Sequence, residues 1–169
     1  MNPLIPEAVA ITKDLGDVTF IGAVAVLLHI RKGRESQDLD FAILAPLSKE
    51  ELEQKGYFTR IESGKEVTRT PRGYKIDIYS RKPIKGISIE EIVETGISKE
   101  INGQPVRFAS LEVLIVLKYR AARTPDVEDL QMLAQRKSQE IRWDVIKELT
   151  SDIEYADLKN TITAFRNIK

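Results

Sequence analysis

The feature that most constrains the fold is an acidic strand that follows a glycine turn and an apolar helix. Gly22 ends a short β-branched stretch, residues 23–30 are almost entirely apolar, and Asp38-Leu39-Asp40-Phe41 follows. Alternate residues of a strand share a face, so Asp38 and Asp40 point one way while Leu39 and Phe41 point into a core. At about 5 Å and an effective dielectric near 20, the two carboxylates repel by roughly 3 kcal/mol.

Such a pair of acids on an otherwise apolar strand has two explanations. A cation can neutralise it, and Mg²⁺ with a phosphate ligand is the usual choice in proteins. Alternatively, the acids lie at a solvated strand end and have no ligand. The pair alone does not decide between a nucleotide site and a wet strand end.

Composition narrows the class of protein. A chain of 169 residues can bury one core with a small helical appendage. Lys+Arg and Asp+Glu both number 26, so no overall field attracts nucleic acid or membrane, and tight non-specific nucleic-acid binding is not expected. The absence of cysteine excludes disulfides, thiolate zinc sites and thiol nucleophiles.

Nothing in the sequence predicts a targeting or membrane segment. Residues 1–7 lack the basic start and apolar centre of a signal peptide. The apolar run at 23–30 is too short to span a bilayer. We therefore expect a cytoplasmic protein with no membrane partner.

Periodicity and turn signals predict an α+β fold with a mixed sheet flanked by helices. Ser48 and Ser88 each open a capping box, and Asn102-Gly103 is a strong hairpin signal. Predicted strands cover residues 18–21, 39–44, 57–62, 66–70, 74–80, 97–101 and 105–109, and predicted helices cover 6–15, 22–31, 48–56 and 88–96.

Everything after Ser110 is predicted to be helical. Helices are expected over 111–123, from Thr124-Pro125 onward, over 141–149 and over 153–165. The change in pattern divides the chain into a core over 1–109 and a helical C-terminal extension over 110–169 that packs on it.

Three further residues point toward one site, and each has an ordinary alternative. Gly22 lies where a strand passes into a helix, so a phosphate could approach its backbone, although most such glycines only form a turn. Asp77 alternates with Ile76 and Ile78 and could add a third carboxylate, or could lie on the wet face of a sheet. Lys118, in an apolar helix, could reach a phosphate or extend to solvent.

Together these residues resemble the DNA polymerase β-like nucleotidyltransferase superfamily. Its signature is a glycine-led turn, a helix, an Asp-x-Asp strand and a later carboxylate on a neighbouring strand. The small prokaryotic branches with abortive-infection and toxin–antitoxin nucleotidyltransferases are most similar, because residues 34–40 match their Arg-x-Thr/Ser-x-Asp-x-Asp run. A later helix over 110–121 and an acidic turn over 126–130 also match, so the likeness covers residues 20–133.

This resemblance implies a metal-dependent nucleotidyltransferase that moves an NMP from an NTP to an acceptor hydroxyl and releases pyrophosphate. The acceptor could be an RNA end, a protein or a small molecule. The residues expected to bind two Mg²⁺ (or Mn²⁺) ions and to be catalytic are Asp38, Asp40 and Asp77. Those expected to contact the nucleotide are Gly22, Ala23, Arg34, Ser36 and Lys118, and the matching second acidic stretch contains Asp126 and Asp129.

One departure from the pattern motivates a rival function. Ala23 stands where the superfamily has Gly or Ser, so a hydroxyl contact to phosphate is missing while the backbone amide remains. The rival is a catalytically weak nucleotide-binding or partner-binding module of antitoxin type, which would bind a second protein.

Three other features receive simpler interpretations. His29, the only histidine, is expected to be a hydrogen-bonded helix residue rather than a general base. Trp143 is expected to be a core residue. The basic residues of segment 60–75 are expected to form a solvated face, and they are also the best candidates for a nucleic-acid backbone contact.

Overall fold

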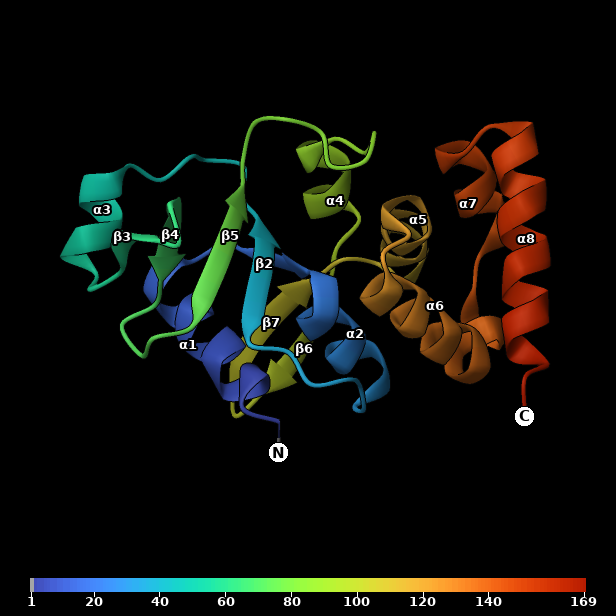
Figure 1. The fold of residues 1–169 in the computed structure, drawn as a ribbon, viewed down its shortest axis with the longest axis horizontal. Helices are drawn as coiled ribbons and strands as arrows, with labels where there is room; N and C mark the ends of the chain where they lie inside the picture. Colours follow the sequence, from blue (N-terminus) through green and yellow to red (C-terminus); the bar gives the residue numbers. More distant parts are fainter. Residues whose placement is uncertain (1) are drawn as a thin grey trace.

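A seven-stranded mixed sheet forms the centre of the computed structural model, which describes residues 2–169 (Figure 1). The strand order is β3-β4-β5-β2-β1-β7-β6. The pairs β2–β5 and β1–β7 are parallel, and the other neighbours are antiparallel. The strands are β1 (Thr19–Ile21), β2 (Asp38–Ala42), β3 (Phe58–Glu62), β4 (Lys65–Arg69), β5 (Lys75–Tyr79), β6 (Ile97–Ile101) and β7 (Gln104–Phe108).

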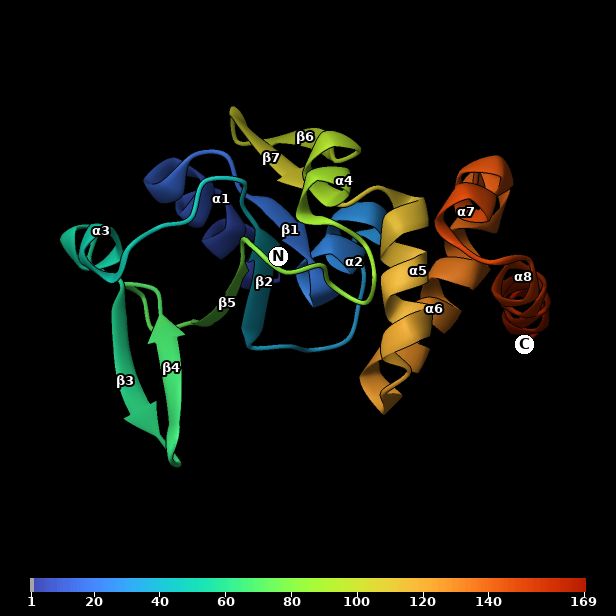
Figure 2. The ribbon, with the colours of Figure 1, turned by 90° about the horizontal axis from the view of Figure 1, so that it is seen from above.

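The C-terminal helices lie together at one end of the molecule. Figures 1 and 2 show α5 to α8 together beyond α2, with the β3–β4 hairpin and α3 at the opposite end of the molecule. The helices are α1 (Leu4–Leu15), α2 (Gly22–Ile30), α3 (Lys49–Gln54), α4 (Ile89–Glu94), α5 (Leu111–Ala121), α6 (Thr124–Lys137), α7 (Trp143–Leu149) and α8 (Asp152–Arg166), with a 3₁₀ turn at Ser138–Glu140. The predicted α+β class is confirmed.

Local sequence signals explain most element ends. The Ser48 hydroxyl accepts the Glu51 N–H while Glu51 accepts the Ser48 N–H, which is the predicted capping box of α3. Asn102 and Gly103 both have positive φ (52° and 79°), as the tight turn between β6 and β7 requires. These boundaries depend on residues a few positions apart and were therefore predictable.

Several helix limits differ from expectation by one or two residues, and two of them have a clear local cause. The first helix begins at Leu4 rather than Pro6, with the Leu4 N–H donating to the Asn2 side chain. Helix α2 ends at Ile30 because Arg31 adopts the left-handed conformation (φ 56°) and its N–H donates to the Leu27 carbonyl. The left-handed residue that ends α2 is thus an arginine, a residue type that rarely adopts this conformation.

The core joins the sheet to the C-terminal helices without an exposed link. Leu39, Phe41 and Ile76 are buried, as are all residues of α5 from 111 to 118. The junction at Ala109 and Ser110 is also buried, and the Ala109 N–H donates to the Phe20 carbonyl. The division at residue 109 stays a prediction. No helix within residues 2–169 is both long and apolar enough to cross a membrane.

Candidate functional site

Parallel pairing of β2 and β5 aligns the acidic residues of the two strands. Asp40 is the register partner of Asp77, and Asp38 is the partner of Lys75. Because these four residues alternate with buried Leu39 and Ile76, they share the opposite face of the sheet. The third carboxylate expected from sequence therefore lies beside the Asp-x-Asp strand.

The Asp40 carboxyl group carries the strongest electrostatic signal at this face. Burial raises its pKa first, and the neighbouring Asp77, through charge and a side-chain hydrogen bond, raises it further. Asp38 adds a smaller increase, Lys118 a small decrease, and the pKa of Asp40 is raised to about 7. Because Asp40 is costly to ionise beside two other carboxyl groups, a nearby cation would strongly stabilise its ionised form.

Gly22 at the start of α2 is required by the position of Asp40. It has φ +66°, and a Cβ at this residue would overlap Oδ2 of Asp40. No side chain caps the N-terminus of α2, so its first backbone N–H groups have no side-chain acceptor. A helix start of this kind favours an anion beside it.

These residues line one cavity of about 610 Å³ between the sheet and the start of α6. The predicted site residues all contribute to its wall: Gly22, Ala23, Arg34, Ser36, Asp38, Asp40, Asp77 and Lys118. They come from the start of α2, the α2–β2 loop, β2, β5 and α5. The cavity combines acids on one wall with cations on the other.

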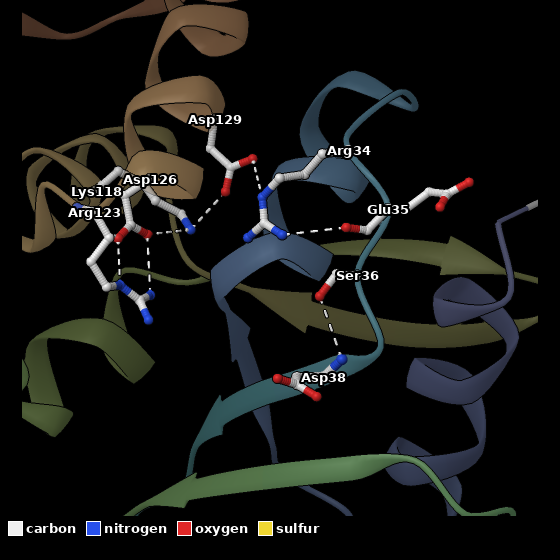
Figure 3. Close-up of polar contacts among 8 residues, drawn as sticks. All are labelled: Arg34, Glu35, Ser36, Asp38, Lys118, Arg123, Asp126 and Asp129. Carbon is white, nitrogen blue, oxygen red and sulfur yellow. Dashed lines mark hydrogen bonds and ion pairs between the residues drawn. The ribbon is translucent and has the colours of Figure 1, made fainter.

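The segment that precedes β2 is held by short-range and long-range contacts. The Asp38 N–H donates to Ser36 Oγ at 3.4 Å. Arg34 donates from Nε to Asp129 Oδ1 at 3.2 Å and from a terminal nitrogen to the Glu35 carbonyl (Figure 3). In the structure Arg34 and Ser36 therefore order the segment, and their contact with a nucleotide stays a prediction.

Lys118 has different partners from those expected. It is 5% exposed, and its ammonium lies between Asp126 Oδ1 at 3.1 Å and Asp129 Oδ2 at 2.8 Å, as Figure 3 shows. Both aspartates are buried. The alternative that Lys118 extends to solvent is wrong, because two buried carboxylates neutralise it inside the protein; contact with a phosphate stays a prediction.

Asp126 connects this buried cluster to Arg123 at the rim of the cavity. It accepts from the Arg123 N–H and from Arg123 Nε at 2.8 Å. Burial would raise the pKa of Asp126, but hydrogen bonds from Arg123 and Lys118 outweigh it and hold the pKa below its usual value. With Arg34, Lys118 and Arg123 against Asp126 and Asp129, the cluster has one excess positive charge, which faces the acidic wall.

The cavity also includes residues that sequence reasoning did not assign to the site: Lys75, Tyr79, Lys85 and Arg123. Lys75 and Tyr79 share the strand face of Asp77, and this alternation was the one available signal. Burial raises the pKa of Tyr79, with Asp40 and Asp77 adding to it. Lys85 and Arg123 lie in loop and cap positions, which no local pattern connects to the acidic strand.

Residues outside the cavity behave largely as expected. His29 donates from Nε2 to the Ala109 carbonyl at 2.9 Å and burial lowers its pKa, which confirms a hydrogen-bonded helix residue. Trp143 packs against the core but is only partly buried. In the basic segment, Arg69 pairs with Glu62 and Arg72 pairs with Glu7, so these cations are largely neutralised.

The acidic wall fits a divalent cation in its chemistry. Carboxylate oxygens are the ligands that Mg²⁺ prefers, and the crowding that raises the pKa of Asp40 would be relieved by a cation. Within residues 2–169 no three His, Cys, Asp or Glu side chains are gathered closely enough to form a ready metal site. Asp40 and Asp77 are neighbours in the strand register, and Asp38 is exposed on the same face of the sheet.

Comparisons with solved structures find the same fold in proteins of low sequence identity. JHP933 from Helicobacter pylori matches with a TM-score of 0.53 and 17% identity over 98% of this chain and 90% of that one. An antigenic nucleotidyltransferase-like protein from Paracoccidioides brasiliensis matches with a TM-score of 0.55 and 17% identity over 96% and 92% of the two chains. No curated protein matches the sequence.

The family comparison covers nearly the whole chain. The model of a family described as nucleotidyl transferase of unknown function (DUF2204) matches residues 6–169, which include every residue of the cavity. This extent agrees with a wall built from both the sheet and the C-terminal helices. The chain belongs to this family of nucleotidyl transferases, whose substrate is a nucleotide.

Proposed function

We propose that the protein transfers an NMP from an NTP to an acceptor hydroxyl, with release of pyrophosphate, in a reaction that depends on Mg²⁺ or Mn²⁺. The observation that carries the proposal is the Asp40–Asp77 pair, which faces the cavity directly beside the uncapped start of α2. Acidic oxygens for cations and free amides for phosphate are both needed to bind a metal nucleotide. The family assignment supports the transfer of a nucleotidyl group.

The acidic residues would neutralise and orient the reacting groups. Asp38, Asp40 and Asp77 would hold two cations, which supply charge stabilisation for the attacking and leaving oxygens. Asp77, opposite Asp40 in the register, would be the general base or bridging ligand. Asp40, whose pKa burial and Asp77 raise to about 7, would be deprotonated where it holds a cation.

The start of α2 beside the acids, together with Arg123 at the rim of the cavity, would hold the triphosphate. Gly22 and the Ala23 amide would receive phosphate oxygens at the start of α2. Arg123 has a largely exposed side chain, so it can reach a phosphate while remaining near Asp126. Catalysis would depend mainly on positioning and charge neutralisation.

We further propose that the protein belongs to the small prokaryotic branch with abortive-infection and toxin–antitoxin nucleotidyltransferases. One observation favours the rival function, a weakly active module that binds a nucleotide or a partner protein. Lys118 is already neutralised by Asp126 and Asp129, and Ala23 lacks a hydroxyl, so two expected phosphate contacts are reduced. The enzyme and the nucleotide-binding form of the module differ in turnover, and the partner-binding form differs also in binding a second protein.

A thermal-shift panel tests nucleotide binding first. The four NTPs are each combined with EDTA, Mg²⁺ or Mn²⁺, on wild type and on Asp38→Asn/Asp40→Asn. Ligand at a hundredfold excess over Kd stabilises the native state by about 2.7 kcal/mol, which is readily measured. The matched control is Glu50→Gln/Glu53→Gln, which removes two exposed carboxylates from α3.

The expected result is a metal-dependent shift in wild type and the control that disappears in the aspartate variant. Release of pyrophosphate with transfer of label from an α-labelled NTP then separates the enzyme from the binding module. A metal-dependent shift without any transfer product, together with co-purification of a second protein, would favour the module. No shift with any NTP would overturn the proposed transferase and leave the partner-binding form of the module, which co-purification tests.

A further inference from the structure

A second cavity, of about 400 Å³, lies at the C-terminal end of α2. The nine residues of α2 separate it from the acidic cavity by about 13 Å. Its lining residues come from α2, β6 and the last turn of α6: His29, Ile30, Arg31, Lys99, Arg136 and Lys137. Among these described residues four carry positive charge and none is acidic, although the whole chain has a net charge of +0.

Helix dipoles do not account for this charge. Two helices have basic last turns here, α2 and α6, and each C-terminus attracts cations with an effective charge of about −0.5. Lys137 also pairs with Glu140 at 3.1 Å. The two helix C-termini together contribute about one negative charge, and the Glu140 carboxylate contributes another. Because four cations line the cavity, an excess of about two positive charges remains.

Two of the four cations that line this cavity have no ion-pair partner among the described residues. Lys99 donates from Nζ to the Leu28 carbonyl at 2.8 Å, which fixes its ammonium at the wall. Arg31 and Arg136 are exposed, and neither guanidinium has an ion-pair partner within residues 2–169. Burial lowers the pKa of Lys99, and nearby Arg31 and Lys137 lower it further, as expected where cations crowd together without an anion.

We propose that this second cavity binds a phosphate group. The excess of about two positive charges matches a phosphate dianion, and guanidinium groups bind phosphate oxygens with two parallel hydrogen bonds. The phosphate could belong to a nucleic-acid strand or to free phosphate or pyrophosphate. The site is separate from the acidic cavity, so the proposal does not rest on nucleotidyl transfer.

The test measures binding of two probes to protein in which the acidic cavity is disabled by Asp38→Asn/Asp40→Asn. One arm titrates pyrophosphate by calorimetry, and the other titrates a labelled 12-mer of single-stranded RNA by fluorescence anisotropy. Into this background we introduce Arg31→Gln/Arg136→Gln, which removes the two free guanidinium groups. The matched control is Lys49→Gln/Lys55→Gln, which removes two exposed cations from the distant α3 region.

We expect the arginine variant to bind at least one probe about tenfold more weakly, and the lysine control to change affinity less than twofold. If the RNA arm responds, its salt dependence (log K against log salt) should become shallower by about 1.4, which corresponds to two lost phosphate contacts. A response to pyrophosphate alone identifies a free phosphate as the ligand, and a response to RNA alone identifies a strand. Equal affinities of the arginine variant and the lysine control in both arms would overturn the proposal. Both substitutions are on exposed side chains, and unchanged melting curves verify folding.

Discussion

The carboxyl groups of Asp40 on β2 and Asp77 on β5 lie side by side because the two strands pair in parallel with these residues in register. Parallel strands connected through the intervening β3–β4 hairpin bring together acids that are far apart in the chain. Burial and this pairing together raise the pKa of Asp40 to about 7, so below that pH and without a cation the site holds a proton that a metal nucleotide would displace.

Stability without metal should therefore fall as pH rises. Since the pKa of Asp40 is higher in the folded protein than its ordinary value of 3.8, the folded state binds more protons between about pH 4 and pH 7. The associated loss of unfolding free energy is at most about 4 kcal/mol, and it is complete above pH 7. Urea unfolding in EDTA at several pH values measures it, with Asp40→Asn as the reference. Parallel pH profiles of wild type and Asp40→Asn would contradict the assignment.

Gly22→Ala should destabilise the protein by more than backbone strain alone. The positive φ costs a non-glycine residue about 1–2 kcal/mol, and the new Cβ also displaces the Asp40 carboxyl group. Gly64→Ala is the matched control, because Gly64 has φ +77° and open space around it. Thermal unfolding should show a larger loss for Gly22→Ala, and Asp40→Ala in the same chain should recover the difference. Equal losses at the two glycines would show that the close approach to Asp40 is unimportant.

Lys118→Met should cost about 3–5 kcal/mol of stability, because it leaves two buried carboxylates without their shared cation. Adding Asp129→Asn should restore part of the loss by removing one of those charges. Lys147→Met, on an exposed position of α7, should change stability by less than about 0.5 kcal/mol. Denaturant unfolding measures all three, and a Lys118→Met variant as stable as Lys147→Met would exclude the buried cluster as a structural element.

A chain that ends at residue 109 should not unfold cooperatively. Residues 23–28 of α2 are buried, and α2 packs against both α5 and α6, so the truncation exposes a continuous apolar surface. Near-ultraviolet circular dichroism and a thermal melt measure the outcome. A cooperative transition in the truncated chain would instead show that the core over 1–109 is an independent domain.

Sequence reasoning succeeded where the controlling interactions are local. The capping box at Ser48 and the turn at Asn102-Gly103 each depend on residues within three positions of one another. The presence of Asp38, Asp40 and Asp77 in one cavity wall has a second cause, the strict alternation of strand faces around Leu39 and Ile76. The left-handed conformation of Arg31 at the end of α2 was not predicted, because this conformation is unusual for arginine.

The sequence by itself determined the elements, the shared face of Asp38 and Asp40, and the glycine at the start of α2, because these follow from backbone sterics and short-range periodicity. Only the tertiary structure decided that Asp77 pairs with Asp40, that β1 lies parallel to β7, and that Asp129 contacts both Lys118 and Arg34. These contacts join residues that are distant in the chain. They depend on the strand order and on which charged side chains are buried, and both are decided by the packing of the whole core. No local pattern contains that information.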